Sequence, residues 1–82
     1  MSIIPNPVYR KLRINFNYTN INLAEINISN ILGVVLKSEK INNNIVHNDY
    51  LEFDVSDLPS GIYFATMKTK DEVITKQFVI LK

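Results

Sequence analysis

The sequence contains no cysteine and no tryptophan, and it has only two glycines and three prolines among 82 residues. Without cysteine there is no disulfide framework, no thiolate nucleophile and no cysteine-based metal site. The longest apolar run, Ile31 to Leu36 with one glycine inside it, is far shorter than the ~20 residues that span a bilayer. A net charge of +1 lacks the basic excess of most nucleic-acid binders. We therefore predict one small domain with neither a nucleic-acid partner nor a membrane span.

Two residue types are abundant instead. The chain has twelve isoleucines and eleven asparagines. Isoleucine favours the half-buried surface of a sheet, whereas asparagine favours turns because its side chain bonds nearby backbone. Codon usage in an AT-rich genome can also enrich both residues, so their order along the chain has to decide. The composition favours short strands joined by asparagine-rich connections.

Apolar and polar residues alternate with a period of two in several segments. Leu12 and Ile14 share one face, and Leu51, Phe53 and Val55 share another. The segment 62–69 is apolar on both faces, which is typical of a central strand. The last segment cannot be given one phase, so we predict a bulge midway along it. The predicted strands cover residues 3–4, 11–16, 24–29, 34–40, 51–56, 62–69 and 73–81.

The breaks between these segments carry turn residues. The opening strand ends at Pro5-Asn6-Pro7, Leu32-Gly33 forms a tight turn, and in Asp57–Gly61 proline fixes φ while glycine permits a positive φ. Longer connections are predicted at 17–22 and 42–49. About seven short strands at this spacing indicate an all-β, immunoglobulin-like antiparallel sandwich. We interpret 1–82 as a single domain, with Met1-Ser2 as an added start, taken from the end of a longer chain.

The sequence offers few candidates for catalysis or for cation binding. His47, the only histidine, stands in a polar loop without a second titrating partner, and no serine has a base nearby. Glu52, Asp54 and Asp57 carry oxygens that suit calcium, although the first two also fit a solvent-facing strand surface. We predict no enzyme activity and no cofactor. A metal ion at these three acidic residues stays an open alternative.

The basic and aromatic residues have structural explanations. Arg10, Lys11 and Arg13 alternate with apolar residues, so a solvated strand face accounts for them better than nucleic acid does. Tyr63 is predicted to lie in the core or to fasten a corner through its hydroxyl group. These residues indicate a binding or structural module.

Four blocks of the sequence together resemble the type A C-terminal sorting domain of the type IX secretion system. They are the opening Ile4–Val8 with the alternating Lys11–Ile14, the middle block Ile28–Val35, the turn and strand Phe53–Phe64, and the ending Ile74–Lys82. The resemblance extends from about Ile3 to Lys82.

Departures from the family pattern are confined to predicted surface and turn positions. Ser29 stands where an aromatic residue is common, and Val34 where a polar residue usually follows the glycine. Lys70-Asp71 occupies a hairpin that often contains glycine. The departures affect individual contacts more than the family assignment.

The resemblance implies a secretion signal that catalyses nothing. Such a domain directs a protein fused to its N-terminus from the periplasm through the outer-membrane translocon of a Gram-negative bacterium. Sortase components then remove the domain, and the cargo is attached to the cell surface or released. The type IX translocon and sortase are thus the expected partners. The residues that carry the family motifs or the expected recognition are Pro5, Asn6, Pro7, Gly33, Pro59, Gly61, Tyr63, Lys76 and Lys82.

Two further expectations concern surfaces. The final strand is expected to offer an edge that pairs with a partner's sheet or with a second copy in a weak dimer, while its lysines equally suit protection of that edge. The alternative function is an accessory immunoglobulin-like or fibronectin-type module of an extracellular enzyme, acting as a spacer or binding glycan. Tyr9, Tyr18 and Tyr50 are the aromatic candidates for a glycan site.

Overall fold

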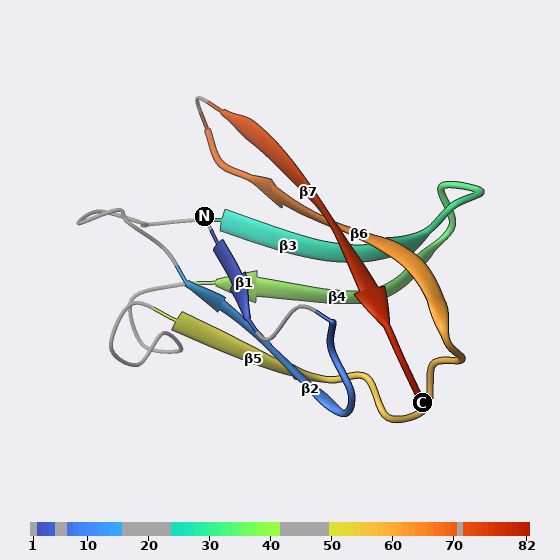
Figure 1. Ribbon diagram of the computed structural model, residues 1–82. Helices are drawn as coiled ribbons and strands as arrows, with labels where there is room; N and C mark the ends of the chain where they lie inside the picture. Colours follow the sequence, from blue (N-terminus) through green and yellow to red (C-terminus); the bar gives the residue numbers. More distant parts are fainter. Residues whose placement is uncertain (1, 5–6, 16–23, 42–49, 71) are drawn as a thin grey trace.

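The computed structural model describes residues 2–4, 7–15, 24–41, 50–70 and 72–82. In this part of the chain every regular element is a strand (Figure 1). No helix among the described residues is long and apolar enough to cross a membrane. The strands are β1 (Ser2–Ile4), β2 (Lys11–Asn15), β3 (Ala24–Asn30), β4 (Val35–Ile41), β5 (Tyr50–Asp54), β6 (Gly61–Lys68) and β7 (Val73–Ile80).

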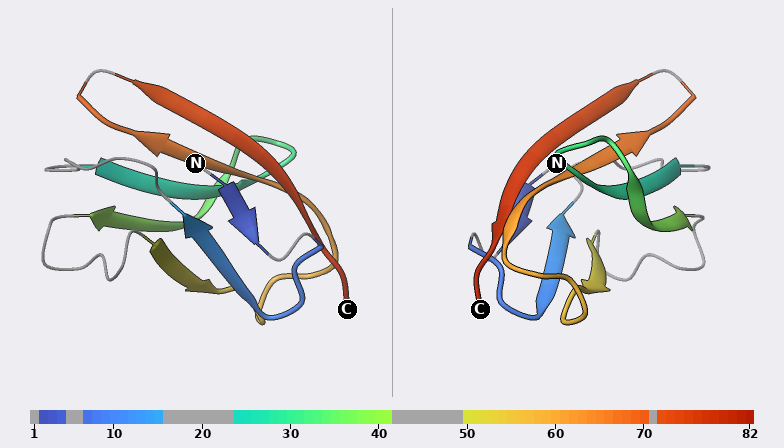
Figure 2. Two further views of the ribbon diagram at one scale, coloured as in Figure 1. Left: turned by 60° about the vertical axis from the view of Figure 1, so that its left-hand side comes forward. Right: turned by 90° about the vertical axis from the view of Figure 1, so that its right-hand side faces the viewer.

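The strands form two antiparallel sheets that pack face to face (Figure 2). One sheet has the order β1-β2-β5 and the other has the order β4-β3-β6-β7. The chain changes layer between β2 and β3, between β4 and β5 and between β5 and β6, as in immunoglobulin-like sandwiches. The predicted fold class is confirmed.

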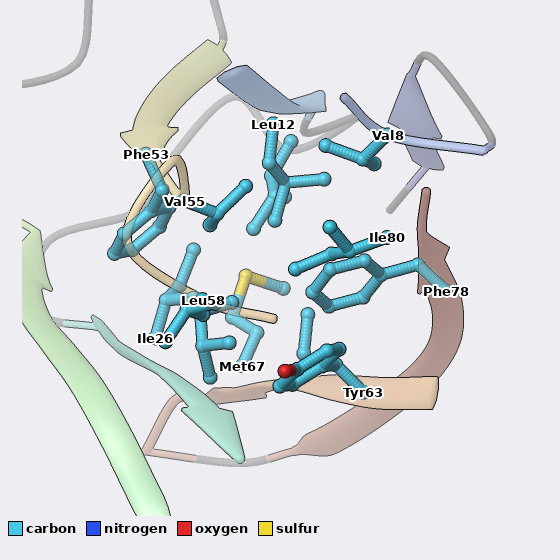
Figure 3. Packing of buried hydrophobic residues seen from close by; sticks show 13 residues of the cluster. Val8, Leu12, Ile26, Phe53, Val55, Leu58, Tyr63, Met67, Phe78 and Ile80 are labelled. Carbon is cyan, nitrogen blue, oxygen red and sulfur yellow. The ribbon is translucent and has the colours of Figure 1, made fainter. Parts of the chain in front are cut away.

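The core lies between the layers because each strand turns alternate residues inward. Figure 3 shows side chains of β2 and β5 facing those of β3, β6 and β7. Burying one large aliphatic or aromatic side chain is worth about 1.5–3 kcal/mol, so this shared core is the main source of stability. The buried cluster consists of Val8, Leu12, Ile14, Ile26, Ile28, Phe53, Val55, Leu58, Tyr63, Ala65, Met67, Phe78 and Ile80.

All seven predicted strands are present, with ends shifted by one or two residues in the described part. β6 is paired on both sides, by β3 and β7, as its two apolar faces predicted. Its residues Tyr63, Ala65 and Met67 face the core. The even-numbered residues Ile62 and Phe64 lie on the outer face of the same sheet.

The predicted bulge in the last strand is wrong. β7 pairs with β6 without interruption from Val73 to Ile80. Lys76 therefore shares the core-facing side with Phe78 and Ile80, yet it is exposed because β7 is an edge strand. The irregularity in this sheet lies between β3 and β4, where the pairing shifts by one residue and Leu36 is the extra residue.

The turn between β3 and β4 is held by Asn30. Its side-chain oxygen accepts hydrogen bonds from the backbone N–H of Leu32 (2.9 Å) and of Val34 (3.0 Å). Gly33 takes a φ of +83°, a left-handed conformation that favours glycine, and its N–H donates to the Asn30 carbonyl (3.0 Å). The predicted Leu32-Gly33 tight turn is confirmed.

Candidate recognition surface

The turn Asp57–Gly61, which we call the corner turn, connects the two sheets. The Tyr63 hydroxyl donates a hydrogen bond to the Pro59 carbonyl (2.7 Å), and the Tyr63 side chain is only 5% exposed. This is the corner role predicted for that tyrosine. Gly61 begins β6 with a φ of +158°, so the positive φ expected of this glycine is confirmed.

The corner turn is coupled to the last strand through stacked rings. The ring centroids of Tyr63 and Phe78 lie 5.9 Å apart at an interplanar angle of 27°. Figure 3 shows both rings within the core. Leu58 adds a buried side chain from the turn itself. The family-motif residues Pro59 and Tyr63 thus have direct roles in holding the fold.

The C-terminal end is fastened to the same turn. The backbone N–H of Lys82 donates to Ser60 Oγ (3.0 Å), and Lys82 Nζ donates to the Ser56 carbonyl. Figure 1 accordingly shows the chain end beside the connection from β5 to β6. Both the backbone N–H and the side-chain ammonium group of Lys82 therefore have a partner in the fold, although the residue is exposed. Its predicted role in recognition is untested.

A groove runs beside this end of the molecule. Three cationic side chains and one carboxylate line it, and the Ser56 hydroxyl (2.6 Å) and N–H (2.9 Å) both donate to Asp54 Oδ1. These hydrogen bonds lower the pKa of Asp54 below its usual value, so the carboxylate stays charged near neutral pH. The lining residues are Tyr9, Arg10, Lys11, Asp54, Ser56, Leu81 and Lys82.

β7 is an edge strand of the four-stranded sheet, and among the described residues only its C-terminal end has a partner on the outer side. Val79 accepts a hydrogen bond from Val8 N–H (2.8 Å), and Leu81 N–H donates to the Val8 carbonyl (2.9 Å). Neighbouring residues of an antiparallel strand direct their backbone groups to opposite sides. The N–H and C=O groups of the other odd-numbered residues of β7 therefore also point away from β6. No strand in the described part of the chain pairs with them. We call Val73–Gln77 the open edge of β7.

The predicted site residues that lie away from the corner turn and the C-terminal end fall at three places. Lys76 lies on the open edge of β7, where no described residue bonds to its ammonium group. Gly33 lies in the β3–β4 turn, at the opposite end of the sheet from the β6–β7 hairpin (Figure 1). Pro7 lies next to Val8, which pairs with the end of β7. Pro5 and Asn6 lie outside the described residues.

The three acidic candidates for a metal ion each interact with a different partner. Glu52 pairs with Arg13 at 3.1 Å, and Asp57 pairs with Lys37 at 3.0 Å, while Asp54 binds Ser56 as described above. Within the described ranges no group of three or more potential metal-binding side chains occurs. Lys37 lowers the pKa of Asp57, mainly through their hydrogen bond. His47 lies outside the described residues.

The aromatic candidates for a glycan site are not gathered. Tyr9 is exposed in the C-terminal groove, whereas Tyr50 carries the Arg13 guanidinium 4.1 Å from its ring centroid. The β2–β5 register pairs Asn15 with Tyr50 at one end and Lys11 with Asp54 at the other. Tyr9 and Tyr50 therefore lie at opposite ends of that pair. Tyr18 lies outside the described residues.

Sequence reasoning missed the polar contacts that fasten the C-terminus. Nothing in the sequence marks Ser56 or Ser60 as a partner of Lys82, yet both accept a hydrogen bond from it. Lys37 likewise donates a hydrogen bond to Asp57 in the corner turn. The separations of 20 to 26 residues left no local signal for these contacts.

The described residues thus define a class of protein: an immunoglobulin-like sandwich with an open terminal strand and a fastened C-terminal end. A family model described as the secretion system C-terminal sorting domain matches residues 2–81. The match spans almost the whole chain, and the chain belongs to this family, the type IX secretion C-terminal sorting domains. No curated protein matches the chain closely enough to be reported as a relative.

Proposed function

We propose that this domain directs an N-terminally fused cargo from the periplasm through the outer-membrane translocon of the type IX system. Sortase components then remove the domain, and the cargo is attached to the cell surface or released. Membership of the sorting-domain family supports this route, because a sorting domain implies a secreted or surface-exposed cargo and the machinery that recognises it. We treat residues 1–82 as one domain, which the single core shared by both sheets supports.

The open edge of β7 is the observation that carries our proposal for recognition. Its outward N–H and C=O groups can accept a strand from a partner, a mode in which the main chain supplies affinity and alternate side chains supply specificity. The edge is bounded by the β6–β7 hairpin at one end and by the contact with Val8 at the other. A partner strand therefore has a fixed length of about five residues to pair with.

The two lysines of the last block, Lys76 and Lys82, have different roles in this proposal. Lys76 projects from the open edge with no bonded partner among the described residues, so it is available to a carboxylate on the added strand. Lys82 is bonded to Ser56 and Ser60, so we assign it to the positioning of the chain end. Pro59 and Tyr63 belong to the corner turn and act on recognition only through the fold.

A charge reversal on the open edge tests this assignment. We expect Lys76→Glu to reduce export of a fused reporter about tenfold, because it replaces an attraction with a repulsion at the contact. Lys70→Glu is the matched control, since Lys70 is an exposed lysine of the same hairpin that lies off β7. Export is measured as the ratio of reporter outside the cell to reporter in the periplasm.

A backbone substitution provides a second test. Thr75→Pro removes an outward N–H from the open edge. Proline is tolerated in edge strands where the N–H position faces away from the sheet. We expect export to fall while the purified domain still melts cooperatively. If both Lys76→Glu and Thr75→Pro are exported like the wild type, recognition does not use this edge.

A further inference from the structure

β4 forms the other margin of the four-stranded sheet. It is the first strand in the order β4-β3-β6-β7, and in the described part of the chain no strand pairs with its outer side. Every residue from Val35 to Lys40 is exposed except Lys37, which is partly buried. Because exposed edges are templates for pairing, the side chains on β4 decide what this edge accepts.

The direction of each backbone group on β4 follows from the pairing registers. Val79 and Leu81 bond to Val8, so the even-numbered residues of β7 bond to β6. Carrying this alternation across β6 and β3 makes Lys37 and Glu39 bond to β3. Ser38 and Lys40 therefore direct their N–H and C=O groups outward. The regular part of the edge ends at the bulge beside Lys37.

The charges around Ser38 are self-complementary. In an antiparallel pair of two β4 strands with the two-fold axis at Ser38, Lys37 lies opposite Glu39 of the second copy, and Glu39 lies opposite Lys37. These two positions are non-hydrogen-bonded pairs, in which side chains approach most closely. Centring the axis on Lys37, Glu39 or Lys40 instead places like charges against each other.

We propose that two copies of this chain associate through β4 in the antiparallel register centred on Ser38, which joins their four-stranded sheets into one continuous sheet. The occupant of the β4 edge is a second copy because the edge complements its own charge pattern. The open edge of β7 does not: a pair centred on Thr75 brings two Lys76 side chains diagonally together on one face.

Lys37 is already positioned for this contact. Its Nζ atom lies 3.0 Å from Asp57 Oδ1, which holds the ammonium group on the core-facing side of β4. Glu39 shares that side, since both residues pair with the inward-facing Ile28 and Ile26. Association therefore extends an existing ion pair into a row of alternating charges. Exposed ion pairs are weak and screened by salt, so we expect a dimer that requires high protein concentration and low ionic strength.

Disulfide trapping tests the register directly, because the chain contains no cysteine of its own. In the proposed dimer the two Ser38 Cα atoms lie about 5.5 Å apart, within the range that a disulfide bridges. The two Lys40 Cα atoms lie about 14 Å apart, which is too far. In a glutathione redox buffer we expect Ser38→Cys to give about ten times more disulfide dimer than Lys40→Cys.

Two further variants complete the test. Thr75→Cys occupies the corresponding outward position at the centre of the β7 edge and reports pairing through that edge instead. Glu39→Lys, measured without any cysteine by sedimentation equilibrium, should weaken association of the chain about tenfold by setting lysines against each other. Ser38 donates a hydrogen bond to Asn27 Oδ1 (2.7 Å), which Ser38→Cys also changes. Ser38→Ala shows how much the loss of this bond lowers the stability of the fold.

The outcomes separate cleanly. The proposal is overturned if Ser38→Cys gives no more disulfide dimer than Lys40→Cys, if Thr75→Cys exceeds it, or if Glu39→Lys associates as strongly as the wild type. All measurements use the purified chain, so they stand or fall independently of its role in export.

Discussion

Removing one oxygen atom from Tyr63 measures what fastens the corner turn. In Tyr63→Phe the buried ring and its stacking on Phe78 remain, and only the 2.7 Å hydrogen bond to the Pro59 carbonyl is lost. Such a bond contributes about 1 kcal/mol net. At about 2.1 cal/mol/K of unfolding entropy per residue, 82 residues convert this loss into a fall in melting temperature of about 6 °C.

The assay is thermal unfolding followed by circular dichroism, with Tyr9→Phe as the control. Tyr9 is 58% exposed and has no hydrogen bond among the described residues, so its substitution should change stability by less than about 0.5 kcal/mol. A Tyr63→Phe variant that melts at the wild-type temperature would refute the fastening role. Export should be unchanged at temperatures well below the melt. Lost export from a stably folded variant would instead make Tyr63 a contact for the receptor.

Acid and backbone strain give two further predictions. The pKa values of Asp54 and Asp57 are lowered in the fold, so their stabilising contribution is present above about pH 4 and is lost as the pH falls through the folded pKa values. Melting temperature measured against pH should therefore fall in acid, and the fall should be smaller in Asp57→Asn. Gly33→Ala should lower the free energy of unfolding by about 1 kcal/mol, because a φ of +83° is strained for alanine. The added Cβ itself would meet no atom within 4 Å, so a clash does not contribute. Gly33→Asn should cost less, and equal losses in both variants would contradict the strain argument.

The strands could be predicted because local alternation is enough to define a half-buried strand. The period of two places Leu12 and Ile14 on one face of their strand and Phe53 and Val55 on one face of theirs, and all four are buried. The two apolar faces of 62–69 likewise predicted a central position for β6. The same reasoning failed where a strand lies at the margin of a sheet. Lys76 breaks the apolar pattern of β7 because water reaches it there, and not because a bulge shifts the register.

The contacts around the chain end could not be predicted, because they join distant segments through short polar side chains. Neither Ser56 nor Ser60 carries a sequence signal for its bond to Lys82. The bulge beside Leu36 was hidden within an apolar run that suits either register. The resemblance to sorting domains, in contrast, depended on four ordered blocks, and the family match over residues 2–81 confirms it.

Localisation of a fused reporter tests the central claim most directly. The chain is fused to the C-terminus of a periplasmic reporter in a Gram-negative host with a working type IX system. We expect the reporter at the cell surface or in the medium, and expect it to remain in the periplasm in the same host lacking the translocon. A stably folded fusion that stays in the periplasm of the intact host would contradict the account.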